Sequence, residues 1–180
     1  MNNRIFNLKT RNNSSMAVYQ TNAIVLKREN IFEADRLYYL YTEDFGRVKA
    51  MAGSVRKMNA KLSGHLEPFN LIWVELMTKK NGDFFITTAL SHKSLLDMNA
   101  APVRSTLFIK MADFILKMLK EPLKDDAIWN LILDNFYNAN SVEADGAEKF
   151  LSEFKNGFIN LLGFGNNFHE ARYYLGDFGV

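Results

Sequence analysis

Basic side chains gather in two short stretches between residues 27 and 61. The first stretch is a pair, and the second runs from an expected strand into the loop that follows it; the residues are Lys27, Arg28, Arg47, Lys49, Arg56, Lys57 and Lys61. Ammonium and guanidinium groups hold nucleic-acid phosphates and release the counterions condensed on them. The pattern therefore predicts a surface that follows a nucleic-acid backbone.

Aromatic side chains lie between these cations in the sequence and could provide stacking platforms for bases. The candidates are Tyr38, Tyr39, Tyr41 and Phe45. Stacking of a base on an aromatic ring contributes about 1 to 3 kcal/mol and tolerates every base. Because the strand that carries the three tyrosines must also fill the core, we expect at least one of them to be structural.

Other kinds of site have little support in the sequence. Gly53 and Gly64 bracket the basic loop, but the chain has neither G-x-x-x-x-G-K-S/T nor G-x-G-x-x-G. Its three histidines lie far apart without further ligands at metal-binding spacing; they are His65, His92 and His169. Two carboxylate pairs have simpler explanations in ion pairing and helix capping; they are Glu33 with Asp35 and Asp125 with Asp126. We expect no metal, no cofactor and no catalytic site.

Charge is divided unevenly along the chain. Residues 1–82 hold 13 Lys and Arg against 7 Asp and Glu, and residues 83–180 hold 9 against 13, for a net charge of +2. This division predicts a basic face in the first half, suited to an anionic polymer. The chain has no cysteine, which fits a reducing compartment. No apolar stretch approaches the roughly 20 residues that span a bilayer, so we expect a cytoplasmic protein with no membrane partner.

Five strand-like segments must position these residues. β-branched and aromatic residues between turn signals predict strands over residues 17–26, 37–42, 47–52, 71–77 and 84–89. Gly46 closes the short connection before the third strand, where a hairpin of this length favours a positive φ. Residues 27–30 are expected to form a polar loop.

Alternation gives the third strand one basic face and one core face. Arg47, Lys49 and Met51 fall on one side, and residues 48, 50 and 52 on the other.

The hydrophobic period lengthens from two to about 3.6 after Leu90, which predicts helices. The first is expected over residues 103–120, and the second begins at Asp125 or Asp126. The third has Asp145 as N-cap, with Glu148 completing a capping box and Gly163 at the C′ position. The residues expected to point inward are Val103, Leu107, Met111, Phe114 and Met118, then Ile128, Leu131, Ile132 and Phe136, and then Ala147, Phe150, Leu151, Phe154, Phe158, Leu161 and Leu162.

Together these elements predict an α+β fold, in which a five-stranded OB-fold barrel precedes an all-α helical domain. Strand spacing alone also allows a small SH3-like barrel. We divide the chain into a flexible extension (1–15), a nucleic-acid-binding OB domain (16–89) and a shortened helical domain (90–180).

The order of several motifs resembles the RecO family of bacterial recombination mediators. The matching stretches are YQTNAIVLKR, EADRL, TEDFGRVKAMAGSVRK and KLSGHLEPF, of which GHLEPF, residues 64–69, is the most specific. FLSEFKNGFINLLGFG, residues 150–165, is similar to a leucine-rich helix of the family's helical domain.

The resemblance implies a protein of DNA repair and recombination that is not an enzyme. It would bind single- and double-stranded DNA, anneal complementary strands and help to load RecA onto DNA covered by single-stranded DNA-binding protein, with RecR as a partner. Such a protein would be cytoplasmic and associated with the nucleoid.

The resemblance also assigns residues by position. Lys27, Arg28, Arg47, Arg56, Lys57 and Lys61 would lie on or beside the DNA-contacting surface. Fold-defining positions would be Asp35, Arg36, Gly64, His65, Glu67 and Pro68, with Arg36 able to join either group or to pair with Glu33 or Asp35. Lys110, Lys117 and Arg172 are cations suited to the acidic tail of single-stranded DNA-binding protein.

Two features depart from the family. Many members carry a cysteine-ligated zinc site after the leucine-rich helix, where this chain reads NNFHEARY and has no cysteine. The chain is also shorter than expected for the family. Two rival hypotheses remain open: a protein-interaction adaptor with an OB fold and little DNA affinity, and an RNA-binding OB protein that recognises the 2′-hydroxyl.

Overall fold

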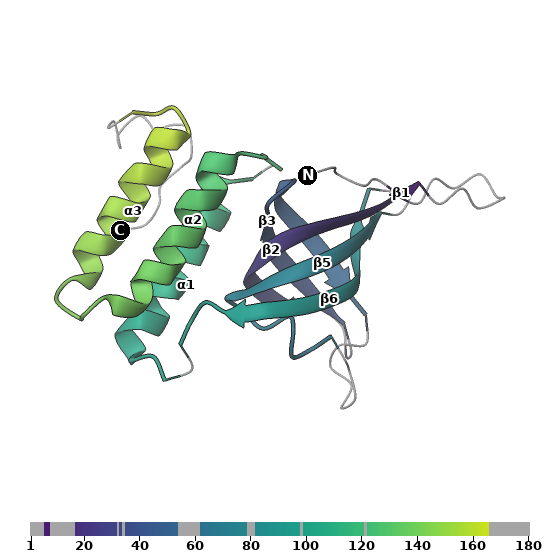
Figure 1. Cartoon of the computed structure of the whole chain (residues 1–180), viewed down its shortest axis with the longest axis horizontal. Coiled ribbons are helices and arrows are strands. Elements are labelled where there is room, and N and C mark those ends of the chain that lie inside the picture. The colour runs from purple at the N-terminus through teal and green to yellow at the C-terminus, as the bar shows by residue number, and fades with distance from the viewer. Residues whose placement is uncertain are drawn as a thin grey trace. The chain divides into compact units, whose positions relative to one another are not determined.

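Strands and helices occupy separate parts of the chain, as the change in hydrophobic period predicts. The computed structural model describes residues 6–7, 17–31, 33, 35–53, 62–78, 82–97, 99–120 and 122–165. The chain forms two compact units, Met1–Ser94 with the strands and Leu95–Val180 with the helices (Figure 1). The protein is therefore of the α+β class.

The five main strands of the first unit pair in a ring. β2 (Ala17–Asn30) is antiparallel to β3 (Arg36–Thr42), and β3 to β4 (Gly46–Ala52). β4 runs parallel to β6 (Phe84–Ser94), which is antiparallel to β5 (Asn70–Thr78), and β5 is antiparallel to β2. Each of these strands thus has two neighbours. The five expected strands are confirmed, although β6 continues to Ser94 rather than ending at residue 89.

Alternation along the strands builds the core of this unit. In β4, Val48, Ala50 and Ala52 are buried, whereas Lys49 is exposed and Arg47 half-buried. The predicted division of this strand into a core face and a basic face is confirmed. The buried cluster also takes Ala23 and Val25 from β2 and alternate residues of β5, such as Ile72 and Val74.

An extra residue in β2 changes the phase of its second half. Val25 lies opposite Leu40 and Lys27 opposite Tyr39, so Leu26 is a β-bulge. The Phe69 N–H donates to the Val25 carbonyl at 2.7 Å. The prediction of a loop at residues 27–30 is wrong, because the bulged strand bends and continues its pairing with β3.

Two further features concern the expected strand boundaries: the turn at Gly46 and a short additional strand. Gly46 has φ +67°, as the hairpin prediction requires, and the Thr42 hydroxyl donates to its carbonyl at 2.9 Å. The two-residue strand β1 (Phe6–Asn7) pairs with Val18 and Ala17, within a stretch expected to be a flexible extension. Because β3 pairs with β2 only from Ala23 onward, this part of the β2 edge is open to β1.

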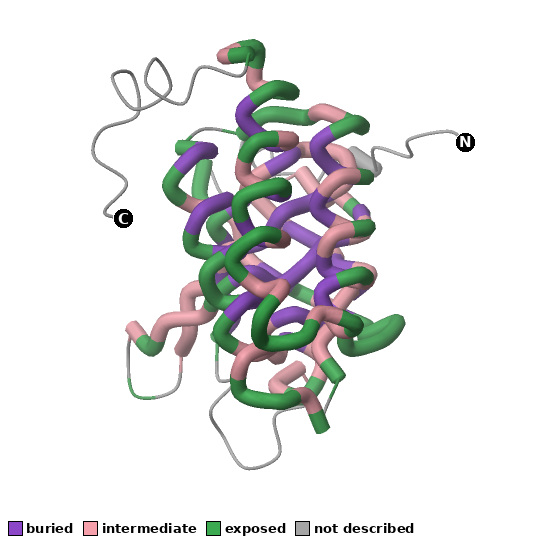
Figure 2. Tube along the Cα trace, turned by 90° about the vertical axis from the view of Figure 1, so that its left-hand side faces the viewer, coloured by how far each residue is buried: buried purple, intermediate pink, exposed green. Residues whose placement is uncertain are grey.

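Three α-helices make up the described part of the second unit: α1 (Pro102–Met118), α2 (Asp126–Asn138) and α3 (Ala147–Leu161), with a 3₁₀ turn, η1 (Ala139–Ser141), after α2. Their buried positions recur at helical spacing (Figure 2). Aromatic rings join the helices, with Phe108 of α1 5.0 Å from Phe136 of α2 and Phe114 of α1 5.7 Å from Phe158 of α3, between ring centroids. No helix among the described residues is long and apolar enough to cross a membrane.

The inward stripes are mostly confirmed. Along α1, the residues expected inward from Leu107 to Met118 are buried, and Phe108 and Ile115 are buried as well. The expectation is wrong for Leu161, which is 42% exposed, while Ile159 is buried in the same turn. In α2, Trp129 is buried although the sequence did not predict it.

Helix ends follow local hydrogen bonding. Of the two predicted caps of α2, Asp125 is the N-cap, where its Oδ1 accepts from the N–H groups of Ala127 at 2.8 Å and Ile128 at 3.0 Å, and Asp126 is the first helical residue. At α3 the N-cap is Gly146, with no side-chain cap, so the prediction of Asp145 is wrong by one residue. The C-terminus of α3 is a Schellman motif with Gly163 at φ +86°.

Candidate nucleic-acid interface

A row of three side chains crosses the outer face of β2, β3 and β4. Lys27 lies opposite Tyr39, and Tyr39 lies opposite Lys49. The Tyr39 ring centroid is 5.9 Å from Lys27 Nζ, 5.5 Å from Lys49 Nζ and 6.0 Å from Arg47 Cζ. We call these four residues together with Glu29 the Tyr39 cluster.

The β-bulge at Leu26 is what brings Lys27 into this row. Ala23 and Val25 face the core, and strict alternation would turn residue 27 inward as well. The extra residue reverses the phase, so that the side chains of Lys27 and Glu29 are 48% and 41% exposed. On β3 and β4, unbroken alternation points Tyr39, Arg47 and Lys49 outward.

Glu29 is a member of the cluster that the sequence did not indicate. Its carboxylate lies 2.9 Å from Lys27 Nζ and accepts a hydrogen bond from the Tyr39 hydroxyl at 3.0 Å. The Lys27 ammonium, and secondly the Tyr39 hydroxyl, lower the pKa of Glu29 below its ordinary value. Burial, and secondly the bond to Glu29, raise the pKa of Tyr39. The cluster therefore presents three cations, one neutral phenol and one carboxylate at neutral pH.

The aromatic residues predicted to stack on bases differ in how far they are buried. Tyr38 and Tyr41 are fully buried, so the prediction that they could stack on bases is wrong for both. Tyr38 belongs to the core cluster of the strands. Tyr39 is half-buried on the outer face. Phe45 lies in the turn after β3, partly exposed, with its ring 5.2 Å from that of Tyr19, and its stacking role stays a prediction.

Arg28 does not join the cluster. It lies opposite the buried Tyr38 and therefore on the other side of β2 from Lys27. Its guanidinium forms an ion pair with Glu67, in the stretch before β5. This contact gives Arg28 a structural role, and its predicted DNA contact stays a prediction. Three further predicted DNA contacts, Arg56, Lys57 and Lys61, lie outside the described residues.

The GHLEPF stretch is fixed by hydrogen bonds of its own. His65 Nδ1 accepts from the Ser91 N–H at 3.1 Å, and the Asn70 amide donates to the His65 carbonyl at 3.0 Å. Leu66 is fully buried. Phe69 has φ +67°, where its N–H reaches the β-bulge. These contacts attach the stretch to β2, β5 and β6, as fold-defining positions would.

Other candidate chemistry is sparse among the described residues. They contain no group of three or more His, Asp or Glu side chains that could hold a metal ion. His92 is hydrogen-bonded to Asn22 at 3.2 Å, and His169 lies outside the described residues. Arg36, which the sequence left between two roles, donates to Asn30 at 3.0 Å.

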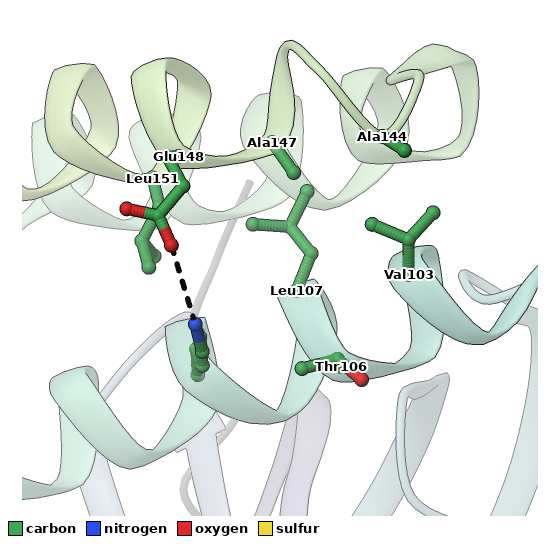
Figure 3. Close-up of a pocket in the computed structure, with 8 residues that line it drawn as sticks. Val103, Thr106, Leu107, Ala144, Ala147, Glu148 and Leu151 are labelled. Carbon is green, nitrogen blue, oxygen red and sulfur yellow. Dashed lines mark ion pairs between the residues drawn. The ribbon is translucent and has the colours of Figure 1, made fainter.

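A pocket of about 150 Å³ lies between α1 and α3 (Figure 3). Its lining is mainly apolar, and Lys110 and Glu148 pair across it at 3.9 Å. Of the cations predicted to receive an acidic tail, Lys110 thus lines a pocket, Lys117 lies on α1 outside its lining, and Arg172 is outside the described residues.

The structure thus contains a small β domain that carries three cations around an aromatic ring on its outer face. Residues 16–94 match the family model described as "Recombination protein O N terminal". This match supports a protein of the RecO family.

Curated relatives support the same assignment. The DNA repair protein RecO of Dehalococcoides mccartyi is 30% identical over 133 residues, 73% of this chain and 52% of the relative. Proteins of the same name from Azobacteroides pseudotrichonymphae and Cutibacterium acnes are 29% and 26% identical, over 66% and 59% of this chain and 50% and 45% of their own lengths. The chain thus spans about half the length of these relatives.

Proposed function

We propose that this protein acts in DNA repair and recombination by binding single-stranded DNA at the Tyr39 cluster, without catalysing a reaction. The observation that carries the proposal is the position of Lys27, Arg47 and Lys49 around one half-buried ring on adjacent strands. The family assignment supplies the DNA repair setting.

The arrangement suits a flexible single strand. Cations spaced along a face follow successive phosphates, and an aromatic ring between them stacks on a base of any identity. Because phosphate contacts carry no sequence information, we expect no strong base preference. Double-stranded DNA would use the phosphate contacts alone.

We infer further that the ring of β2 to β6 is a Greek-key barrel of the OB type. The pairing order and the parallel contact of β4 with β6 support this reading. In such barrels the second and third strands line the oligonucleotide-binding face, and these strands are β3 and β4 here. The predicted cations of the loop after β4, Arg56, Lys57 and Lys61, would extend the same face.

The wider role is proposed from the family. Neutralising two DNA strands on a basic face lowers their repulsion and would promote annealing. Loading of RecA onto DNA covered by single-stranded DNA-binding protein, with RecR, would place the protein on the nucleoid in the cytoplasm. The apolar pocket with Lys110 is our candidate for the acidic tail of single-stranded DNA-binding protein.

A titration tests the proposal. A fluorescent single-stranded DNA oligonucleotide is titrated with the full chain and followed by anisotropy, with an RNA of the same sequence as competitor. We expect binding that weakens steeply with salt and is at least as tight for DNA as for RNA. Preference for RNA would favour RNA binding through the 2′-hydroxyl, and no binding at low salt would leave the adaptor hypothesis.

A further inference from the structure

The carboxylate of Glu29 lies within the Tyr39 cluster, which is proposed to bind DNA. Both of its oxygens are engaged, Oε1 with Lys27 Nζ at 2.9 Å and Oε2 with the Tyr39 hydroxyl at 3.0 Å. The negative charge of Glu29 repels phosphate. It also pairs with Lys27, one of the cations that a phosphate would contact. The structure of β2 fixes this arrangement, because Lys27 and Glu29 lie on the same face of one strand.

We infer that Glu29 is an affinity-determining residue of the proposed interface. In the free protein the Glu29 carboxylate forms an ion pair with the Lys27 ammonium. This ion pair must break before Lys27 can contact a nucleic-acid phosphate. This inference rests on the proposed function. The Glu29 carboxylate competes with the DNA phosphate for Lys27, and this competition limits the affinity of the cluster for DNA.

The exchange of partners is physically easy. Both side chains are nearly half exposed, and exposed ion pairs of this kind are weak because water screens them. The ammonium group of lysine sits on a flexible stem, so it can turn from the carboxylate toward a phosphate without backbone movement. A glutamate with the ordinary pKa of 4.5 is already ionised at neutral pH, and Lys27 lowers the pKa of Glu29 further.

Glu29 also positions the ring. Its second oxygen accepts the Tyr39 hydroxyl and so orients the aromatic face between Lys27 and Lys49. The two effects on binding oppose each other, and substitutions separate them. Glu29→Gln removes the charge but keeps an oxygen that accepts from Tyr39, whereas Glu29→Ala removes both.

The test compares charge removal at two sites in the full chain. Binding of a fluorescent oligo-dT is measured by anisotropy for the wild type, Glu29→Gln and the control Glu75→Gln. Glu75 lies on β5, where it accepts hydrogen bonds from Gln20 and Thr87. We expect Glu29→Gln to bind about two- to fivefold more tightly than Glu75→Gln. Its slope of log affinity against log salt should be steeper by about 0.7, which is one added phosphate contact on a single strand.

A double-mutant cycle with Lys27→Ala completes the test. We expect Lys27→Ala to weaken binding more in the Glu29→Gln background than in the wild type, because the competitor is gone. Additive effects, or Glu29→Gln binding no more tightly than Glu75→Gln, would overturn this inference while leaving the proposed function intact. Absence of salt-dependent binding by the wild type would overturn both.

Discussion

At the scale of single residues, Tyr39 is the side chain on which the account depends most. Its neighbours along β3, Tyr38 and Leu40, are buried, while its own ring faces outward among cations. We expect Tyr39→Ala to weaken binding of single-stranded DNA by about five- to a hundredfold, because base stacking is lost. Tyr39→Phe should retain most of the affinity, because it keeps the ring. Anisotropy titrations measure both, and equal affinity of Tyr39→Ala and the wild type would remove Tyr39 from the interface.

The sequence could predict the basic face of β4 but not the outward tyrosine of β3. Arg47 and Lys49 alternate with small apolar residues, so polarity alone assigns their face. Tyr38 and Tyr39 are the same residue type on opposite faces of β3, and only the packed core distinguishes them. Glu29 was missed because its place in a strand depends on the bulge at Leu26, for which the sequence carries no signal.

At the scale of elements, Asp125 and Asp145 allow a controlled comparison, because both were considered as helix N-caps and only Asp125 is one. Asp125 caps α2 with two hydrogen bonds, whereas Asp145 precedes Gly146, the actual N-cap of α3. We expect Asp125→Ala to lower the free energy of unfolding by about 1 kcal/mol and Asp145→Ala to change it by less than about 0.5 kcal/mol. Urea denaturation followed by circular dichroism measures both, and equal effects would contradict the assignment of the caps.

A second prediction at this scale concerns Lys155 of α3, whose ammonium lies 5.6 Å from the Phe114 ring centroid. Burial, and secondly repulsion from Lys110 and Lys117, lower its pKa. Between the lowered pKa and the ordinary value, the unfolded chain binds more protons, so this residue makes stability rise with pH. We therefore expect Lys155→Met to be more stable than the wild type at neutral pH, with a gain that shrinks as pH rises through this window.

Urea midpoints at neutral and alkaline pH measure this difference. Lys149→Met is the control, because Lys149 lies on the same helix with its side chain 82% exposed. A variant at position 155 that is less stable than the wild type at neutral pH would show that the contact of the ammonium with Phe114 outweighs burial and repulsion.

The helices could be predicted more fully than their ends. The apolar stripe of α1 has an unbroken helical period, so its face follows from the sequence. Asp145 and Glu148 have the spacing of a capping box, yet α3 begins one residue later than this motif requires. The start of a helix depends on the backbone angles of the preceding turn, which side-chain spacing does not determine.

At the scale of the whole molecule, the sequence predicted a basic strand unit before an acidic helical unit, and strands and helices do separate into two units at Ser94. The order of strand pairing could not be read from spacing, which also allowed an SH3-like barrel. It follows from long-range contacts, above all the pairing of β2 with both β3 and β5. All the cations proposed to contact phosphates lie in the first unit.

The most direct measurement of the central claim is the salt dependence of single-stranded DNA binding by the wild type and by the double variant Arg47→Ala/Lys49→Ala. The double variant Lys124→Ala/Lys149→Ala, in the helical unit, controls for the same loss of two positive charges. The account predicts weaker binding by the double variant, with a slope of log affinity against log salt that is shallower by about 1.4, or about 0.7 for each lost phosphate contact. A slope equal to that of the wild type would contradict the account, because the cations of the Tyr39 cluster would then make no contact with the phosphates.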